Sequence, residues 1–282
     1  MKSRRYLTPS GLSLAADIGG DPAAQPVIML HGGGQTRYAW GEAAKALVSS
    51  GFHVISLDLR GHGESDWDPN GDYGIDAYLS DLQAIIASVA SPPALVGASL
   101  GGIISILYAG EPRPHPVSAV VLVDVTPRVE ADGAKQIRDF MLGTARGFAS
   151  VEAAADAVAA YLPHRTRPQS TAGLQKNLRR RDDGLYYWHW DPRMLDASKS
   201  VRPHSMQTRM EAAAQQIDVP TLLVRGSLSE LVSAQSVAEF RRLCPKAEFV
   251  DVPGAAHMVA GDRNTAFNAA VIEFLQRRLG VA

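Results

Sequence analysis

The segment around Ser99 has the residue types and the spacing of a serine nucleophile. Ser99 lies at the centre of a G-x-S-x-G pattern whose glycines are Gly97 and Gly101. An apolar run that can form a strand precedes it, and an apolar run that can form a helix follows it. Glycines two residues before and after the serine would avoid a clash in the sharp strand-to-helix turn that exposes its hydroxyl. This context favours nucleophilic catalysis over a chance match.

A serine hydroxyl needs a base that accepts its proton, and the base needs an acid that orients it. His257 is the best candidate among the eight histidines because it follows three small residues in a loop just after the last predicted strand, Glu248–Val252. Catalytic groups in parallel α/β sheets gather at the carboxyl ends of the strands. We therefore expect His257 to be the base rather than a structural histidine.

Two carboxylates compete for the role of the acid. Glu230 is the only carboxylate in the loop after the predicted strand Thr221–Val224, where it could instead complement the dipole of the next helix. Asp124 directly follows the predicted strand Ala119–Val123, where it could instead be a turn or cap residue. We expect Glu230 to be the acid and keep Asp124 as the alternative.

Catalysis of acyl transfer also needs two backbone amides that bind the negatively charged oxygen of the transition state. The N–H of Leu100, directly after the serine, is one expected donor. The glycine run that follows His31 ends a buried strand and lets the backbone approach a reacting carbonyl. Gly33 is the expected second donor, and the alternative is that this run is only a flexible turn.

Short apolar runs alternate with helical patterns along most of the chain, which is typical of an α/β protein with a largely parallel sheet. The later strands are nearly continuous apolar runs, as expected for strands covered by helices on both faces. The expected strands are Arg4–Thr8, Leu12–Ile18, Val27–Leu30, Val54–Leu57, Ala94–Gly97, Ala119–Val123, Thr221–Val224 and Glu248–Val252. The expected helices are about Trp40–Ser50, Ile75–Ala90, Leu100–Ala109, Val232–Leu243 and Ala266–Leu279.

Residues 127–216 interrupt this alternation. They contain no convincing strand, but Ala-rich helical stretches such as Val151–Leu162, several prolines and an aromatic cluster at 186–190. A structureless loop of this length is improbable in a compact domain, so we expect 127–216 to form an inserted helical cap and 1–126 with 217–282 to form the core domain. The cluster could line an apolar pocket or only pack the cap onto the core. The candidate pocket residues are Gly34, Trp188 and Trp190.

The composition excludes several classes of protein. Lys and Arg number 28 and Asp and Glu 29, so the net charge of −1 argues against partners such as nucleic acid or an anionic membrane. The single cysteine, Cys244, excludes an intrachain disulfide framework and a cysteine-rich zinc site. No secretory signal, membrane span, cofactor motif or metal-ligand cluster is evident in the sequence. We expect a cytoplasmic protein that acts on a small-molecule substrate without a cofactor or metal; a homodimer stays open.

Four segments, in this order, resemble the α/β-hydrolase superfamily: the glycine run at 31–34, residues 58–65, the Ser99 pattern and Gly254–His257. Residues 58–65 read DLRGHGES, similar to the D-x-R-G-x-G-x-S turn that is common after the fourth strand in this superfamily. We interpret this turn as structural, with Asp58 and Arg60 bracing neighbouring loops; His62 could instead face the pocket.

The resemblance implies an α/β-hydrolase fold, with a mostly parallel eight-stranded sheet flanked by helices and an inserted helical cap, in the esterase-like branch with a serine nucleophile. Many members carry Asp after the seventh strand, where this chain has Ser229 and Glu230; this departure keeps Asp124 as an alternative. The expected activity is hydrolysis of a small to medium carboxylic ester or lactone through an acyl-enzyme. Carbon–carbon bond hydrolysis, cofactor-free perhydrolase or haloperoxidase activity, and non-catalytic binding of a small ligand on this fold stay open.

Overall fold

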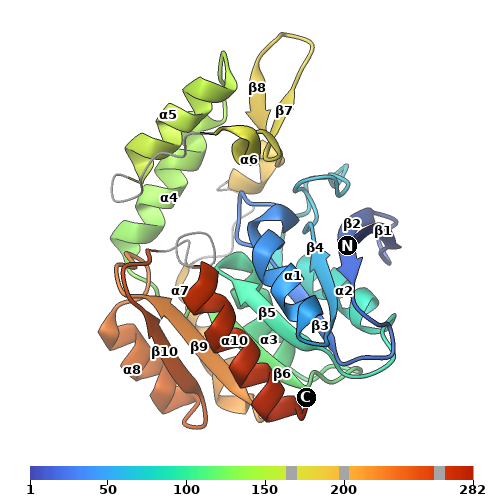
Figure 1. Ribbon diagram of the computed structural model, residues 1–282. Helices are drawn as coiled ribbons and strands as arrows, with labels where there is room; N and C mark the ends of the chain where they lie inside the picture. Colours follow the sequence, from blue (N-terminus) through green and yellow to red (C-terminus); the bar gives the residue numbers. More distant parts are fainter. Residues whose placement is uncertain (163–169, 197–202, 257–263, 282) are drawn as a thin grey trace.

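Eight strands form one sheet in the computed structural model of the protein (Figure 1). The structure describes residues 1–162, 170–196, 203–256 and 264–281. Each strand expected from the sequence is present, with small shifts at some of its ends. The strands are β1 (Lys2–Leu7), β2 (Ser13–Gly19), β3 (Pro26–Leu30), β4 (His53–Leu57), β5 (Ala94–Ala98), β6 (Ala119–Val123), β9 (Thr221–Gly226) and β10 (Glu248–Val252).

The strand order explains how residues far apart in the sequence come together. The order is β1-β2-β4-β3-β5-β6-β9-β10, and β2 pairs antiparallel with β1 and β4 while the other neighbours are parallel. The C-terminal ends of the central parallel strands therefore lie at one edge of the sheet. His31, Ser99 and Asp124 directly follow β3, β5 and β6 at this edge, and Ser229 lies in the loop after β9.

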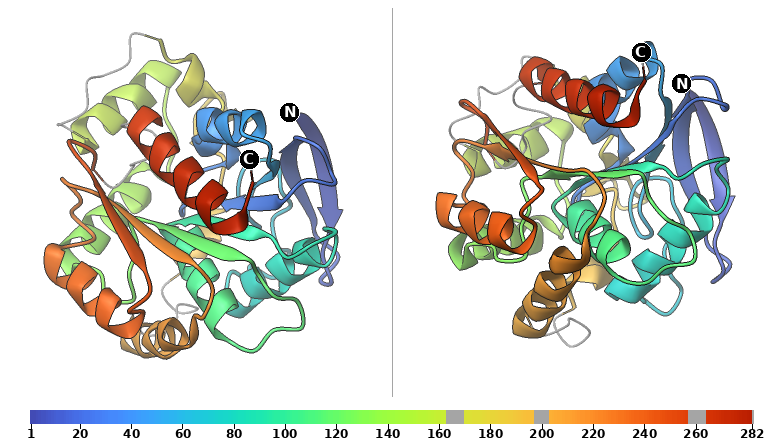
Figure 2. Two further views of the ribbon diagram at one scale, coloured as in Figure 1. Left: turned by 60° about the horizontal axis from the view of Figure 1, so that its bottom comes forward. Right: turned by 90° about the horizontal axis from the view of Figure 1, so that it is seen from below.

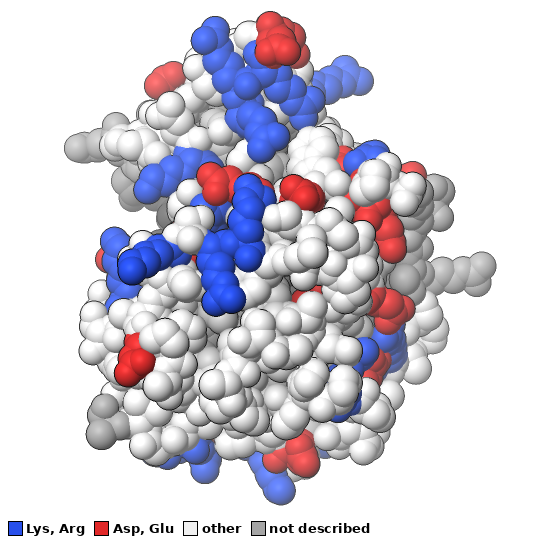
Figure 3. All heavy atoms as spheres, turned by 90° about the vertical axis from the view of Figure 1, so that its right-hand side faces the viewer, with Lys and Arg blue, Asp and Glu red and all other residues white. Residues whose placement is uncertain are grey.

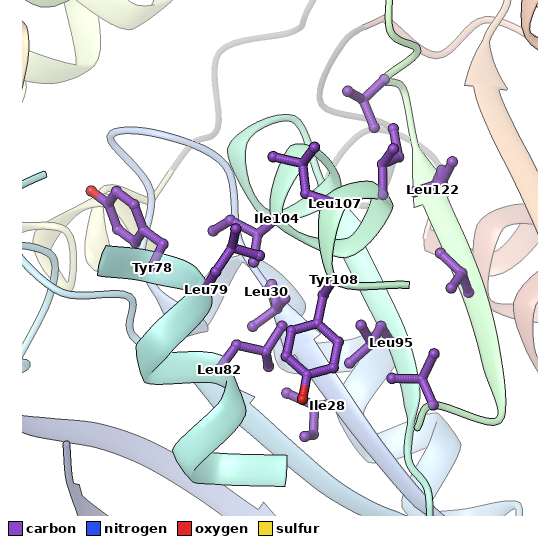
Figure 4. Packing of buried hydrophobic residues seen from close by; sticks show 14 of the residues in the cluster. Ile28, Leu30, Tyr78, Leu79, Leu82, Leu95, Ile104, Leu107, Tyr108 and Leu122 are labelled. Carbon is purple, nitrogen blue, oxygen red and sulfur yellow. The ribbon is translucent and has the colours of Figure 1, made fainter. Parts of the chain in front are cut away.

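Helices cover both faces of the sheet (Figure 2). The helices of these two layers are α1 (Gly41–Ser49), α2 (Ile75–Ile86), α3 (Leu100–Gly110), α8 (Ala234–Leu243) and α10 (Asn264–Leu279), and α7 (Pro203–Gln216) packs on α3. Because successive side chains of a strand point to opposite faces, Val27 and Met29 of β3 pack with α1 and α10, whereas Ile28 and Leu30 pack on the other side. Figure 4 shows side chains of α2 and α3 over Ile28 and Leu30.

The chain between β6 and α7 forms a cap that projects from the sheet (Figure 1). It consists of α4 (Ala131–Thr144), α5 (Val151–Tyr161), the short α6 (Ala172–Gln175), and the antiparallel hairpin of β7 (Leu178–Arg180) and β8 (Tyr186–Trp188). The sequence did not predict the hairpin, because strands of three residues are too short to show an alternating pattern. In the part of the chain that the structure describes, no helix is long and apolar enough to span a lipid bilayer.

Helix α7 lies within the segment expected to form the cap, yet it packs on the core. Its residues Met210, Ala213 and Ala214 belong to the apolar cluster that contains α3. Gly110 at the end of α3 makes this contact close, since a Cβ there would lie 2.0 Å from the carbonyl oxygen of Ala213. The part that stands over the sheet edge is therefore α4 to β8, and α7 returns the chain to the core.

Candidate active site

Ser99 lies on a strained turn between β5 and α3. Its backbone has φ 46° and ψ −112°, in the positive-φ region that a side chain other than glycine rarely adopts. The flanking glycines make the turn possible. A Cβ on Gly97 would lie 2.3 Å from the carbonyl oxygen of Gly101, and a Cβ on Gly101 would lie 2.1 Å from that of Leu30. The turn therefore holds the serine at the start of α3, at the sheet edge.

The glycine run after β3 forms a tight turn beside this serine. The N–H of Gln35 donates to the carbonyl oxygen of Gly32 (3.1 Å), and the Gln35 side chain accepts from the N–H of Gly32 (3.0 Å). Gly34 has φ 78°, a value that suits glycine at the third position of a turn. A Cβ on Gly32 would lie 3.4 Å from the Cβ of Ser99, so the turn borders the serine side chain.

Two backbone amides near Ser99 are available to a ligand. The amides of Gly32, Gly34 and Gly101 already donate to acceptors of the protein. Within the described residues, no acceptor is found for the N–H of Gly33 or the N–H of Leu100. These are the two donors expected from the sequence, and their availability is what an oxyanion hole requires.

His62 is completely buried next to the glycine turn. Its Nε2 accepts the N–H of Gly34 (3.1 Å), so its proton is on Nδ1, which faces the carbonyl oxygen of Arg60 (3.0 Å). Burial lowers the pKa of His62 to about 3. The ring is therefore neutral at neutral pH, and both of its nitrogens are engaged within the protein.

His31 lies against His62, with the ring centroids 4.8 Å apart in an edge-to-face arrangement. Its Nε2 accepts the N–H of Leu59 (3.0 Å), and its Nδ1 donates to the carbonyl oxygen of Gly32 (2.8 Å). That oxygen belongs to the peptide group that carries the Gly33 N–H. Burial, followed by the charge of Arg37, lowers the pKa of His31 to about 4, so His31 is also neutral and fixes this peptide group.

Asp124 is fully buried where β6 ends and has φ 50°. Its Oδ1 accepts the N–H of Gly226 (3.3 Å), and its Oδ2 accepts the hydroxyl of Ser229 (2.6 Å). The Ser229 hydroxyl in turn accepts the backbone amides of Leu231 (3.2 Å) and Val232 (3.0 Å). Asp124 is thus a carboxylate held in one orientation by the loop after β9.

Glu230, the acid first expected, has an exposed side chain. Its backbone packs on the cap, where a Cβ on Gly133 of α4 would lie 2.3 Å from the carbonyl oxygen of Glu230. After burial, the negative charge of Glu230 is the second cause that raises the pKa of Tyr161 in α5. Glu230 therefore lies where the core meets the cap.

His257 lies outside the described residues, but the residues just before it lie beside Gly226, at the end of β9. Ala255 and Ala256 are buried, and a Cβ on Gly226 would lie 2.5 Å and 2.4 Å from their carbonyl oxygens. Gly226 is also the residue whose amide binds Asp124. The chain that leads to His257 therefore runs beside the backbone that holds Asp124.

The cap reaches the glycine turn through α4 and the residues after β8. A Cβ on Gly34 would lie 3.0 Å from the Cε of Met141 and 3.8 Å from the Nε1 of Trp190. Trp190 is buried in this contact. Trp188, by contrast, donates its N–H to the hydroxyl of Thr144 (2.9 Å) and fastens the hairpin to α4. Of the candidate pocket residues, Gly34 and Trp190 are thus neighbours at the glycine turn, and Trp188 lies within the cap.

The cap is attached to the core by a short antiparallel bridge between His62 and Trp190. On either side of it, the N–H of Gly63 donates to the carbonyl oxygen of His189 (2.6 Å) and the N–H of Asp191 donates to that of Gly61 (2.8 Å). The hydroxyl of Tyr73 adds a hydrogen bond to the Asp191 carboxylate (2.5 Å), and Thr36 adds one to Asn177 (2.6 Å).

Ion pairs and hydrogen bonds brace the 58–65 turn, which contains His62 of this bridge. Asp58 accepts the backbone amides of Arg37 (2.6 Å) and Glu64 (2.9 Å) and forms a buried ion pair with the Arg37 guanidinium. Arg60 forms a two-pronged pair with Asp81, with both nitrogen–oxygen distances at 2.6 Å. Asp58 and Arg60 therefore brace neighbouring segments and are not available to a substrate.

The basic run at 179–181 lies on the cap hairpin. On the face of the molecule that Figure 3 shows, Lys and Arg side chains gather at the cap end. The Arg181 guanidinium lies 4.0 Å from the ring centroid of Tyr187, and Arg179 donates to Nε2 of His189 (2.8 Å). Arg181 also lies 5.9 Å from the ring centroid of Trp67, so both cations are engaged by side chains of the protein.

Known proteins show the same architecture. Residues 25–263 match the alpha/beta hydrolase fold family. Esterase Rv0045c of Mycobacterium tuberculosis is 32% identical over 227 residues, covering 78% of this chain and 72% of the relative. The 2-(acetamidomethylene)succinate hydrolase of Mesorhizobium japonicum is 29% identical over 235 residues, covering 83% and 82%. A crystal structure of E-2-(acetamidomethylene)succinate hydrolase superposes with a TM-score of 0.85 at 25% identity, covering 98% of this chain and 99% of that one.

Proposed function

Because the chain belongs to the alpha/beta hydrolase fold family, we propose that this hydrolase cleaves a small to medium carboxylic ester or lactone through an acyl-enzyme. One observation carries the proposal: Ser99 lies on a strained turn beside two amides, of Gly33 and Leu100, for which the described residues provide no acceptor. A carbonyl oxygen bound by these amides would bring its carbon to the serine hydroxyl. The likeness to an esterase supports the same class of reaction.

The proposed reaction has two halves. The Ser99 hydroxyl attacks the carbonyl carbon while His257 takes its proton, and the Gly33 and Leu100 amides bind the oxyanion. The tetrahedral intermediate collapses as His257 returns the proton to the leaving alkoxide, which releases the alcohol and leaves an acyl-Ser99. A water molecule then attacks the acyl group with His257 again as base, which releases the carboxylic acid and restores the serine.

For the acid of the triad we propose Asp124 in place of Glu230. A carboxylate that orients and stabilises an imidazolium acts best when it is buried and fixed, and Asp124 is buried and bound by Gly226 and Ser229. The chain just before His257 packs on Gly226 as well. The exposed side chain of Glu230 would act through solvent, where its interaction with the base is screened.

Carbon–carbon bond hydrolysis and perhydrolase or haloperoxidase activity use the same catalytic groups and differ in product. We therefore test the proposal with a panel of purified-enzyme assays on p-nitrophenyl acetate and butyrate, simple lactones, a vinylogous diketone acid, and acetate with peroxide and bromide. Ester or lactone turnover that disappears in Ser99→Ala supports the proposal. Turnover confined to the diketone acid, or halogenation alone, would reassign the reaction. Saturable ligand binding without any product would indicate a binding protein.

A further inference from the structure

We propose that His62 is a positioning residue of the oxyanion hole, which it also joins to the cap. The inference rests on the proposed hydrolysis at Ser99, because it concerns the turn that would bind the oxyanion. His62 touches no substrate atom in this account. It acts by holding the backbone of Gly34 through its Nε2, and thereby the orientation of the adjacent Gly33 N–H.

The glycine turn needs such a support because its own residues impose little order. Gly32, Gly33 and Gly34 carry no side chains, and a Cβ added to Gly33 would meet nothing within 4 Å. Glycine backbones lose the most conformational freedom on ordering, so the peptide planes of this turn are fixed by hydrogen bonds. Those bonds come from Gln35 and His31 on one side of Gly33 and from His62 on the other.

The two peptide groups that flank Gly33 are held by two histidines whose rings meet edge to face. His31 binds the carbonyl oxygen of the Gly32–Gly33 peptide, and His62 binds the N–H of the Gly33–Gly34 peptide. The rings support one another at 4.8 Å. Because His62 offers an acceptor only when neutral, its burial and its lowered pKa keep the Gly34 bond intact.

The backbone of His62 ties the same turn to the cap. Its bridge to Trp190 is flanked by hydrogen bonds on both sides, and the Trp190 ring lies beside Gly34. One residue therefore contacts the cap through its main chain and the oxyanion turn through its side chain. His62 therefore contributes both to the docking of the cap and to the geometry of the oxyanion hole.

Two matched variants separate the acceptor of His62 from its other contacts. His62→Gln can place a carbonyl oxygen where Nε2 accepts the Gly34 N–H. His62→Asn keeps an amide donor near the position of Nδ1, but its side chain is too short to place an acceptor at the position of Nε2. Both keep the main chain of residue 62 and so the bridge to Trp190.

The experiment measures kcat and KM for p-nitrophenyl butyrate together with the rate of phosphonylation of Ser99 by a small fluorophosphonate. Loss of one oxyanion donor typically lowers kcat by a factor of about 100 to 1000, so we expect His62→Asn to lower kcat at least about tenfold, with KM nearly unchanged and phosphonylation slowed in parallel. His62→Gln should recover most of the rate. Equal rates in the two variants would overturn the inference.

The control in unmodified protein is nuclear magnetic resonance of the 15N-labelled chain. We expect a scalar coupling across the hydrogen bond between the Gly34 nitrogen and His62 Nε2, and a folded protein without it would overturn the inference even if neither variant folds. A wild type that shows no hydrolysis and no phosphonylation dependent on Ser99 would overturn the proposed function itself. An active wild type whose two variants behave alike would overturn only the role of His62.

Discussion

The hydroxyl of Ser229 donates a hydrogen bond to the carboxylate of Asp124, with 2.6 Å between the oxygens. The two residues are joined across neighbouring parallel strands, because Asp124 follows β6 and Ser229 follows β9. The loop after β9 thus provides a serine that orients a carboxylate from the adjacent strand. This relationship is the main structural reason to propose Asp124 as the acid.

The first prediction concerns that acid. Asp124→Asn should lower kcat for ester hydrolysis by roughly 1000- to 10,000-fold, because it removes the charge that stabilises the protonated base. Glu230→Gln, the matched control, should stay within about threefold of wild type, because its side chain is exposed. Circular dichroism and thermal melting of both variants check that they fold. The reverse ranking of the two kcat values would restore Glu230 as the acid.

The second prediction concerns Ser229. Ser229→Ala removes the hydroxyl that donates to Asp124 and accepts from Leu231 and Val232. A hydrogen bond to a buried charged group is worth about 1.5 to 3 kcal/mol, so the free energy of unfolding in urea should fall by about that amount. Ser91→Ala, at an exposed serine outside this loop, is the control. An unchanged midpoint for Ser229→Ala would show that its hydroxyl does not support Asp124.

The third prediction concerns the pH dependence of stability. Burial lowers the pKa of His31 to about 4 and that of His62 to about 3. A histidine in the unfolded chain has a pKa of about 6.5. The unfolded chain therefore binds more protons than the folded one between these values, and stability is lost as the pH falls below about 6.5. Near pH 5 each histidine should contribute a slope of about 1.4 kcal/mol per pH unit.

Urea unfolding of wild type and of His62→Gln between pH 7 and 5 measures this slope. The variant cannot titrate at residue 62, so its stability should depend on pH less steeply than that of the wild type, by about one proton at pH 5. Parallel pH profiles for the two proteins would mean that His62 is not buried in its neutral form.

The fourth prediction concerns the turn that carries the nucleophile. Gly101→Ala would place a Cβ 2.1 Å from the carbonyl oxygen of Leu30, so it should destabilise the fold by at least about 2 kcal/mol. Gly143→Ala is the matched control because nothing lies within 4 Å of its Cβ in the helix α4. There alanine should be neutral or stabilising by up to about 1 kcal/mol. Similar melting temperatures for the two variants would contradict the close packing at Ser99.

Features that depend on local sequence were predictable. The strands follow from short apolar runs, and the Ser99 turn follows from glycine spacing within a few residues. The assignment of the Gly33 and Leu100 amides as oxyanion donors stays a prediction. Asp124 and Ser229 are 105 positions apart, and their contact depends on the pairing of β6 with β9. No local pattern reveals that contact, and so the sequence favoured Glu230 in the expected loop.

Other tertiary contacts are hidden from the sequence for the same reason. Helix α7 reads as part of the cap until its packing on α3 is seen, since that contact depends on Gly110 and Ala213 approaching closely. The support of Gly34 by His62 is likewise tertiary. The glycine turn and the 58–65 turn were both recognised in the sequence, but nothing in either one indicates that they touch.

The most direct test of an activated Ser99 is the intact mass of wild type and Ser99→Ala after exposure to a fluorophosphonate. We expect a single phosphonyl adduct on the wild type, located on the peptide that contains Ser99, and none on the variant. A folded, monodisperse wild type that gains no adduct and does not hydrolyse small activated esters would contradict it.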